Sequence, residues 1–271
     1  MIEIDILNKL NAPTREERLA NLKEILKTTE FPPMVPQYIN NHIHTTYSFS
    51  PYSPTAAVYA ARMEGLCTAG IIDHDSISGA REFLAAAELV GMPVTVGMEC
   101  RVSMDSTAMQ SKRTNNPDQV GVSYMTIQSV PHDKIETLNA WFAPYRAARG
   151  RRNRAMVEKI NALLDGIALD YDRDVLPLSE AKEDGGVTER HLMYALAKKM
   201  TQTAGKGQPM VDYLASIGLN LSEKQKNQML DTAYPFYEYD LLGILKSAFV
   251  PKIYIDATDE CPNVRDVAKL C

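Results

Sequence analysis

Strand-like and helix-like segments alternate through residues 38 to 103, and this alternation constrains the fold more than any other feature of the sequence. Three short segments with the character of strands are separated by alanine-rich segments with helical spacing. The expected strands are YINNHIHTTY, TAGIIDHD and VTVGMECRV, and the expected helices are PTAAVYAARMEGL and SGAREFLAAAELVG. A fourth strand is expected at VSYMTIQSV, near residues 122 to 130. Strands separated by helices predict an α/β fold with a parallel sheet or barrel and right-handed crossovers.

The remaining sequence is mostly helical in character. A helix is expected over about residues 14 to 28 with Thr14 as its N-cap, and FPPMVP breaks the chain after it. Strand character returns at KIYIDAT, near residues 252 to 258, and a further helix begins at PNVRDVAKLC. We therefore expect an N-terminal helical extension over residues 1–37 and a barrel domain over residues 38–271, of which residues 133–247 are mostly helical.

Composition excludes several classes of protein. A chain of 271 residues with 45% hydrophobic and 23% charged residues is typical of a globular protein with one large domain or two small ones. Its net charge of −5 does not favour nonspecific binding to nucleic acid. The N-terminus lacks the apolar core of a signal peptide, and no run approaches the ~18 apolar residues of a membrane span. Because the four cysteines show no C-x-x-C spacing, we expect a cytoplasmic protein with free thiols.

Potential metal ligands end three successive strands. His42 and His44 share one face of the first strand, Asp73 and His74 end the second, and Glu99 lies in the third. Functional groups gather where the carboxyl ends of parallel strands meet, and imidazole with carboxylate suits Zn, Mn or Fe. Each motif alone also has an ordinary explanation, such as a helix cap after Asp73 or an ion pair at Glu99. Their occurrence on three consecutive strands favours a metal site.

The same residues carry a family resemblance. Residues 39 to 102 resemble the polymerase and histidinol phosphatase (PHP) domain, whose motifs are matched by His42-Ile43-His44, by Asp73-His74 and by Glu99. TERHLMYALAKK resembles the family's helix-opening histidine motif, which implies that His191 is a ligand. The resemblance implies a distorted (β/α)7 barrel that holds two or three Mn, Zn or Fe ions and hydrolyses phosphate esters. It also implies that Asp73 and His74 assist proton transfer.

The sequence departs from the family pattern in two places. The fourth strand lacks the expected ligand histidine, and His132, just after that strand, is the nearest candidate. No histidine follows His191, so the family's last two motifs are absent. Together with the helix that begins at PNVRDVAKLC, these absences predict a barrel that is incomplete at its C-terminus, poorly soluble and weakly active.

Basic residues provide candidates for binding a phosphorylated substrate. Arg154 belongs to an arginine cluster that also includes Arg146, Arg149, Arg151 and Arg152, and guanidinium groups bind phosphate in a bidentate manner. Lys112 and Arg113 lie in the loop after the third strand, which is expected to open toward the metal site. A solvated helix face is the ordinary alternative for the arginines.

Three functions are therefore compatible with the sequence. The first is hydrolysis of a phosphomonoester or nucleotide phosphate by a metal-activated water. The second is hydrolysis of a C–N bond by an amidohydrolase-like enzyme with a similar ligand set. The third is a noncatalytic regulatory module whose metal shell is incomplete.

Overall fold

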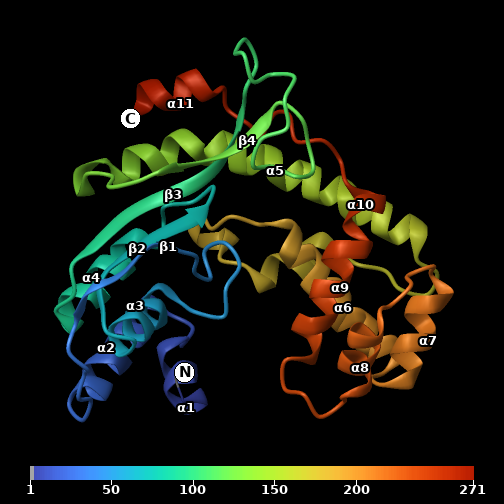
Figure 1. The fold of residues 1–271 in the computed structure, drawn as a ribbon, viewed down its shortest axis with the longest axis horizontal. Coiled ribbons are helices and arrows are strands. Elements are labelled where there is room, and N and C mark those ends of the chain that lie inside the picture. The colour runs from blue at the N-terminus through green and yellow to red at the C-terminus, as the bar shows by residue number, and fades with distance from the viewer. Residues whose placement is uncertain (1–2) are drawn as a thin grey trace. The chain divides into compact units, whose positions relative to one another are not determined.

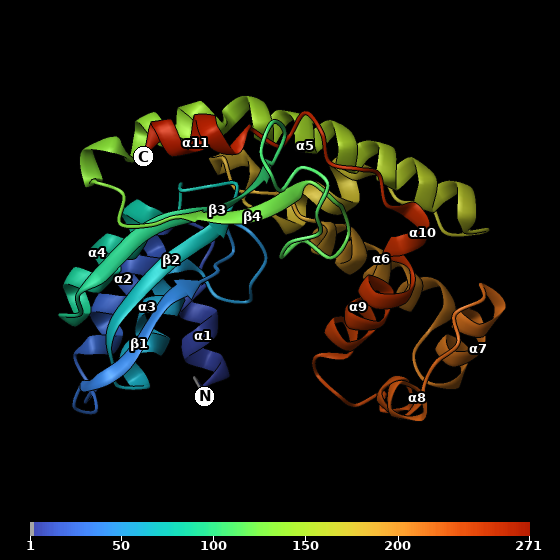
Figure 2. The same ribbon diagram turned by 45° about the horizontal axis from the view of Figure 1, so that its top comes forward.

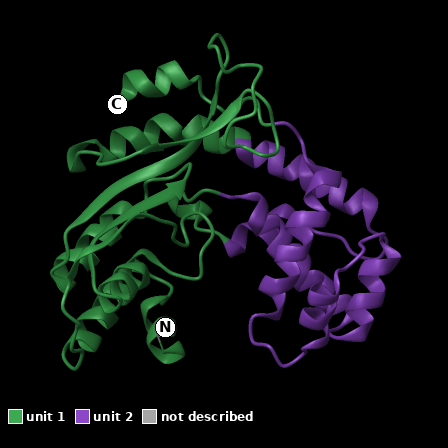
Figure 3. Cartoon of the chain, in the orientation of Figure 1, with its two compact units in different colours: residues 1–148, 179–186, 257–271 green, residues 149–178, 187–256 purple. Residues whose placement is uncertain are grey.

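The computed structural model describes residues 3–271, which divide into two compact units. Unit 1 contains residues 1–148, 179–186 and 257–271, and unit 2 contains residues 149–178 and 187–256 (Figure 3). Each unit is therefore assembled from pieces of chain that are distant in sequence. The expected boundary after residue 37 and the expected loss of C-terminal strands stay predictions.

A curled four-stranded sheet forms the centre of unit 1. Its strands are β1 (Val35–Ile43), β2 (Leu66–His74), β3 (Val94–Ser103) and β4 (Val122–Ile127), and they lie side by side in that order (Figure 2). The β1–β2 and β2–β3 pairs are parallel, as the alternation of strands and helices predicted. The observed fold is thus mixed α/β with the sheet curled like half of a barrel.

Two crossover helices connect the parallel strands. Helix α3 (Pro54–Met63) begins after Ser53, whose side chain accepts a hydrogen bond from the Ala56 amide. Helix α4 (Ala80–Val90) ends at Gly91, which has a φ of 66° that glycine adopts without strain. The helices pack against each other and against the sheet, which buries a core that includes Ala56, Val58, Ile71, Phe83 and Met98.

Further segments complete unit 1 (Figure 1). Helix α2 (Arg15–Leu26) begins at a capping box formed by Thr14 and Glu17, which confirms the predicted cap, and it packs on α3 and α4. The remaining elements of unit 1 are α1 (Ile4–Leu10), the short helices His132–Lys134 and Ala181–Glu183, the first part of α5 (Ile135–Leu163), and α11 (Val264–Leu270). Phe142 of α5 and Val267 of α11 join the same hydrophobic core.

Two expectations about strands are corrected. Strand β4 is antiparallel to β3, because the connection over residues 104–121 contains no crossover helix that could return the chain in parallel. KIYIDAT forms no strand: helix α10 (Val250–Ile253) occupies its start, and the rest is irregular. Pro251 suits the first turn of that helix, and the Ala257 amide donates to the Gln119 side chain rather than to a strand.

Unit 2 is helical. It contains the second part of α5, a π-helical turn at Tyr171–Val175, a short helix at Leu176–Leu178, and the helices α6 (Glu189–Ala204), α7 (Gln208–Ser216), α8 (Glu223–Leu230), α9 (Tyr237–Ala248) and α10. Helices α6 and α9 contact each other along buried side chains that include Leu192, Leu196, Leu241 and Leu245. Within residues 3–271, no helix is long and apolar enough to cross a lipid bilayer.

Candidate metal centre

Three side chains converge in unit 1: His42 in β1, His44 just after β1, and Glu99 in β3. The ligand atoms of His42, His44 and Glu99 all lie within 4.8 Å of one another. The Nε2 atoms of His42 and His44 lie 3.8 and 3.7 Å from the same oxygen, Oε2 of Glu99. Two imidazoles and a carboxylate at this spacing fit a first-row transition metal such as Zn, Mn or Fe.

His74 lies against the same carboxylate. Its Nδ1 atom is 3.1 Å from Oε2 of Glu99, and its ring stacks on that of His44 at a centroid distance of 4.5 Å. The parallel register pairs His74 with Glu99, which places both side chains on one face of the sheet. Burial raises the pKa of Glu99, and Asp75 raises it further, while His42 opposes the shift. A cation held here would offset the desolvation of this carboxylate.

Asp73 lies on the opposite face of the sheet, because it directly precedes His74 in the strand. Its side chain is 1% exposed and accepts hydrogen bonds from the Thr45 amide (2.6 Å), the Thr45 hydroxyl (2.5 Å) and the Ser48 hydroxyl (2.6 Å). Burial raises the pKa of Asp73 to about 6, although these hydrogen bonds oppose the shift. All three donors belong to the loop that follows His44, so the contacts of Asp73 fasten this loop to β2.

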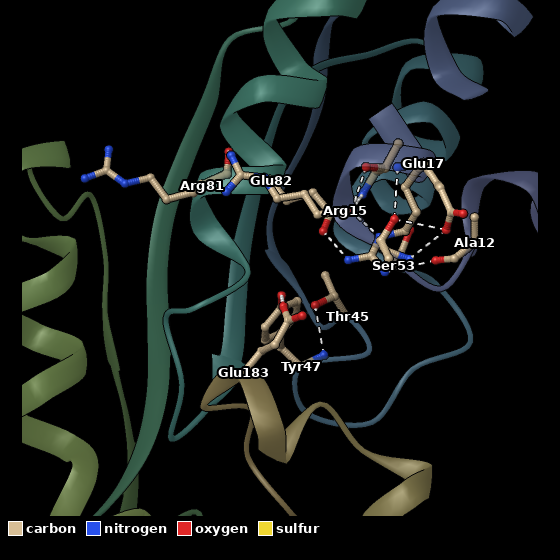
Figure 4. Close-up of polar contacts among 12 residues, drawn as sticks. Ala12, Arg15, Glu17, Thr45, Tyr47, Ser53, Arg81, Glu82 and Glu183 are labelled. Carbon is tan, nitrogen blue, oxygen red and sulfur yellow. Dashed lines mark hydrogen bonds and ion pairs between the residues drawn. The ribbon is translucent and has the colours of Figure 1, made fainter. Parts of the chain in front are cut away.

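The loop after β1 has a second attachment in the segment 179–186. The Tyr47 hydroxyl donates to Oε2 of Glu183 (2.7 Å), and the two side chains face each other in Figure 4. The Gly186 amide donates to the Tyr47 carbonyl (2.7 Å). A Cβ atom at Gly186 would overlap the carbonyl oxygen of His74, so only glycine permits this close approach. The segment therefore supports the backbone that carries His44 and His74.

Other predicted residues of unit 1 lie outside the group formed by His42, His44 and Glu99. His132 is exposed at the start of a short helix, and its carbonyl accepts a hydrogen bond from Arg81 (2.8 Å). Lys112 and Arg113 are exposed in the loop between β3 and β4, where the Arg113 guanidinium contacts the Pro117 carbonyl. Their roles as ligand and substrate contacts stay predictions.

Two predicted residues lie in unit 2. His191 is buried in α6, where its Nδ1 atom accepts a hydrogen bond from the Thr188 amide (3.0 Å). Burial, reinforced by Arg149, lowers the pKa of His191 to about 3, so the ring is neutral at physiological pH, as a metal ligand requires. Arg154 is exposed and forms a bidentate ion pair with Asp172 at 2.5 and 2.6 Å. Ligation by His191 and substrate binding by Arg154 stay predictions.

The predicted arginine cluster has different partners along α5. Arg149 and Arg152 each form a 2.8 Å ion pair with Glu189 in unit 2. Arg146 belongs to unit 1 and donates to the carbonyl oxygen of Asp75 (3.2 Å), the residue after His74. Burial lowers the pKa of Arg146, and Asp184 and Asp75 oppose this shift. Arg146 therefore contacts the backbone next to His74.

Sequence reasoning missed Tyr124 as a residue of this region. Its ring centroid lies 5.9 Å from that of His74. Arg101 lies two residues after Glu99 and therefore on the same face of β3. An antiparallel pairing of β3 with β4 places Tyr124 opposite Arg101, and this register could have identified Tyr124. The alternation of strands and helices predicts a parallel fourth strand, which gives no such register.

No family model matches the chain. Over 173 residues the chain is 27% identical to a 5'-3' exoribonuclease from Haemophilus influenzae, a match that covers 64% of this chain and 55% of that protein. The chain thus spans about half the length of the curated relative that it matches.

Two solved structures align with parts of the chain. One, from Bifidobacterium adolescentis, is provisionally assigned as a metal-dependent phosphoesterase; it has a TM-score of 0.49 and 21% identity, over 80% of this chain and 85% of that one. The other is an amidohydrolase from Chromobacterium violaceum with a TM-score of 0.47 and 22% identity, over 59% of this chain and 49% of that one.

Proposed function

We propose that this chain provides the metal centre of a hydrolase that cleaves phosphate esters, either phosphomonoesters or nucleotide phosphates. The observation that carries the proposal is the convergence of His42 of β1, His44 just after β1, and Glu99 of β3. The sequence similarity to an exoribonuclease, whose substrate is a phosphodiester, supports the choice of phosphate esters.

In this proposal each candidate residue has a separate role. His42, His44 and Glu99 hold a divalent ion, Mn, Zn or Fe, and His74, His132 and His191 are the candidates for completing a site with two or three ions. When bound, such an ion lowers the pKa of water and offsets charge on phosphoryl oxygens. His74 lies beside the Glu99 carboxylate, where its ring can hold or move a proton. Asp73 holds the loop that follows His44, and Lys112, Arg113 and Arg154 supply cationic groups for the substrate.

The metal content of purified protein tests this proposal. After removal of loosely bound ions, the wild-type chain is expected to retain Mn, Zn or Fe, and the double variant His42→Ala/His44→Ala is expected to lose most of it. His132→Ala serves as a comparison outside the converging group, and its metal content shows whether His132 is also a ligand. Full metal retention by the double variant would refute the site.

A substrate panel tests the reaction class. Phosphomonoesters, nucleotides and cyclic amides are offered to the metal-loaded protein with and without chelator. We expect turnover of phosphate esters that chelator abolishes and that Glu99→Gln lowers by orders of magnitude, because a charged ligand is lost. Turnover of the amides alone would instead assign a C–N hydrolase.

A further inference from the structure

Next to the metal centre, the face of the sheet that bears Glu99 continues into a second row of side chains. The antiparallel register pairs Glu99 with Thr126 and Arg101 with Tyr124. Residues two apart in a strand share a face, and directly opposite residues of an antiparallel pair lie side by side. Arg101 and Tyr124 therefore lie on the Glu99 face, one row further along the strands.

Arg101 in this row is a fixed structural group. Its side chain is 3% exposed, and its guanidinium forms a 3.0 Å ion pair with Glu260, whose side chain is also buried. Its Nε atom donates to the Tyr124 hydroxyl at 3.2 Å, and its guanidinium carbon lies 5.5 Å from the centroid of the Tyr124 ring. Arg101 thus fixes the phenol of Tyr124 rather than facing a ligand itself.

The backbone of Tyr124 is fixed as well. Its amide donates to the Asn115 side chain (2.9 Å), and its carbonyl accepts from the same side chain (3.0 Å). The ring is tilted at 53° to His74, and the residue is half-buried, so the phenol is held in place but accessible. Such fixation lowers the cost of ordering a side chain when a ligand binds.

The Tyr124 hydroxyl can still donate its own proton in a hydrogen bond. A tyrosine hydroxyl donates one hydrogen bond and accepts others, and here the oxygen accepts from Arg101. Among residues 3–271, no acceptor lies within hydrogen-bond distance of that hydroxyl proton. A donor fixed beside His74 suits an oxygen anion bound at the neighbouring metal centre.

We propose that Tyr124 is a substrate-binding residue whose hydroxyl donates a hydrogen bond to a phosphoryl oxygen of the substrate, with Arg101 and Glu260 as its positioning residues. This inference rests on the proposed function, because it places the phosphoryl group at His42, His44 and Glu99. It adds a neutral donor to the cationic substrate contacts expected from the sequence, and it assigns a purpose to the Arg101–Glu260 pair.

The test is a titration of the Mn²⁺-loaded full chain with inorganic phosphate by calorimetry. Tyr124→Phe removes only the hydroxyl and is expected to weaken phosphate binding about 10-fold, since a hydrogen bond to a charged group is lost. Its affinity for Mn²⁺ and its unfolding temperature should remain those of the wild type. Tyr38→Phe, at an exposed position in β1, is the matched control and should bind phosphate normally.

The outcomes separate this inference from the proposed function. Equal phosphate affinity of Tyr124→Phe and wild type overturns the role of Tyr124, as does a loaded wild type that binds no phosphate. If the wild type binds phosphate but hydrolyses no ester, the proposed reaction is wrong. The titration then still decides whether Tyr124 binds phosphate. If the wild type binds no Mn²⁺, both proposals fail. Weaker Mn²⁺ binding by Tyr124→Phe would instead make Tyr124 a ligand and overturn its assignment as a donor to substrate.

Discussion

At the scale of single residues, the metal centre depends on one carboxylate oxygen. Oε2 of Glu99 lies between 3.1 and 3.8 Å from a nitrogen of His42, His44 and His74. Without a cation, a neutral imidazole can donate to the half-buried carboxylate through the one N–H that its tautomer carries. With a cation, the nitrogens and the carboxylate become ligands together. Glu99 is therefore the contact that the three histidines share.

Asp73 offers the first residue-scale prediction. If Asp73 holds the loop that carries His44, Asp73→Asn should lower metal affinity as well as activity, because an amide nitrogen would face the Thr45 and Ser48 donors. Ser48→Ala, which removes one of the three hydrogen bonds, should produce a smaller change in the same direction. Metal titrations of both variants check this. Loss of activity with unchanged metal affinity would instead support the catalytic role that the family resemblance implies.

At the scale of elements, a buried ion pair joins helix α2 to helix α4. Arg18 forms a bidentate pair with Glu82 at 2.8 and 2.6 Å, and both side chains are almost completely buried. Glu82 also accepts hydrogen bonds from the amide and hydroxyl of Thr55 at the start of α3 (Figure 4 shows Glu82). One carboxylate thus fastens three helices.

Removal of Arg18 tests the strength of this junction. Arg18→Met leaves Glu82 buried without its cation and should lower the free energy of unfolding by about 3–5 kcal/mol. Lys27→Met breaks the exposed pair with Glu24 on the same helix and should cost less than ~0.5 kcal/mol. Urea unfolding of the two variants measures both values. Similar small losses would show that the junction contributes little to stability.

In unit 2, Asp174 connects the turn at Tyr171–Val175 to α6. Its hydrogen bonds with Arg173 lower its pKa to about 2, with further contributions from the Asp170 amide and from Lys199 of α6, while burial opposes the shift. Because the folded-state pKa is below the unfolded value, the contribution of Asp174 to stability is present above about pH 4 and is lost as pH falls toward 2.

This linkage predicts a pH-dependent effect of Asp174→Asn. The variant should unfold at a lower temperature than wild type at pH 7, and the difference should disappear near pH 2. Asp165→Asn changes an exposed carboxylate of the same unit and should show no such trend. Melting curves across this pH range check the expectation, and a difference that persists at pH 2 would contradict it.

The elements also show what the sequence could and could not predict. The β1–α3–β2–α4–β3 part was predictable because the spacing of hydrophobic residues changes from strand-like to helix-like at each element. The order of these elements in turn brings His42, His44, His74 and Glu99 together. The direction of β4 depends on the irregular loop 104–121, where only contacts distant in sequence, such as Gln119 with Ala257, decide the path. The register that reveals Tyr124 follows from that direction, so it was not predictable.

At the scale of the whole molecule, the division into two units predicts how metal affects unfolding. His42, His44 and Glu99 all belong to unit 1. A ligand raises the stability of the unit that binds it, by about 2.7 kcal/mol at 100 times its dissociation constant. Scanning calorimetry with and without Mn²⁺ should therefore show one transition that moves upward and one that does not. Movement of both would support His191 of unit 2 as an additional ligand.

The ion pair between Arg101 and Glu260 joins residues 159 positions apart, and unit 2 is encoded between them. During synthesis, β3 leaves the ribosome with its arginine long before the matching glutamate has been translated. At typical elongation rates the interval is on the order of ten seconds. During that time Arg101 can contact Tyr124 but not Glu260, while the helical unit is being made. Unit 1 therefore cannot be completed until unit 2 has been translated, even though its first strand is made early.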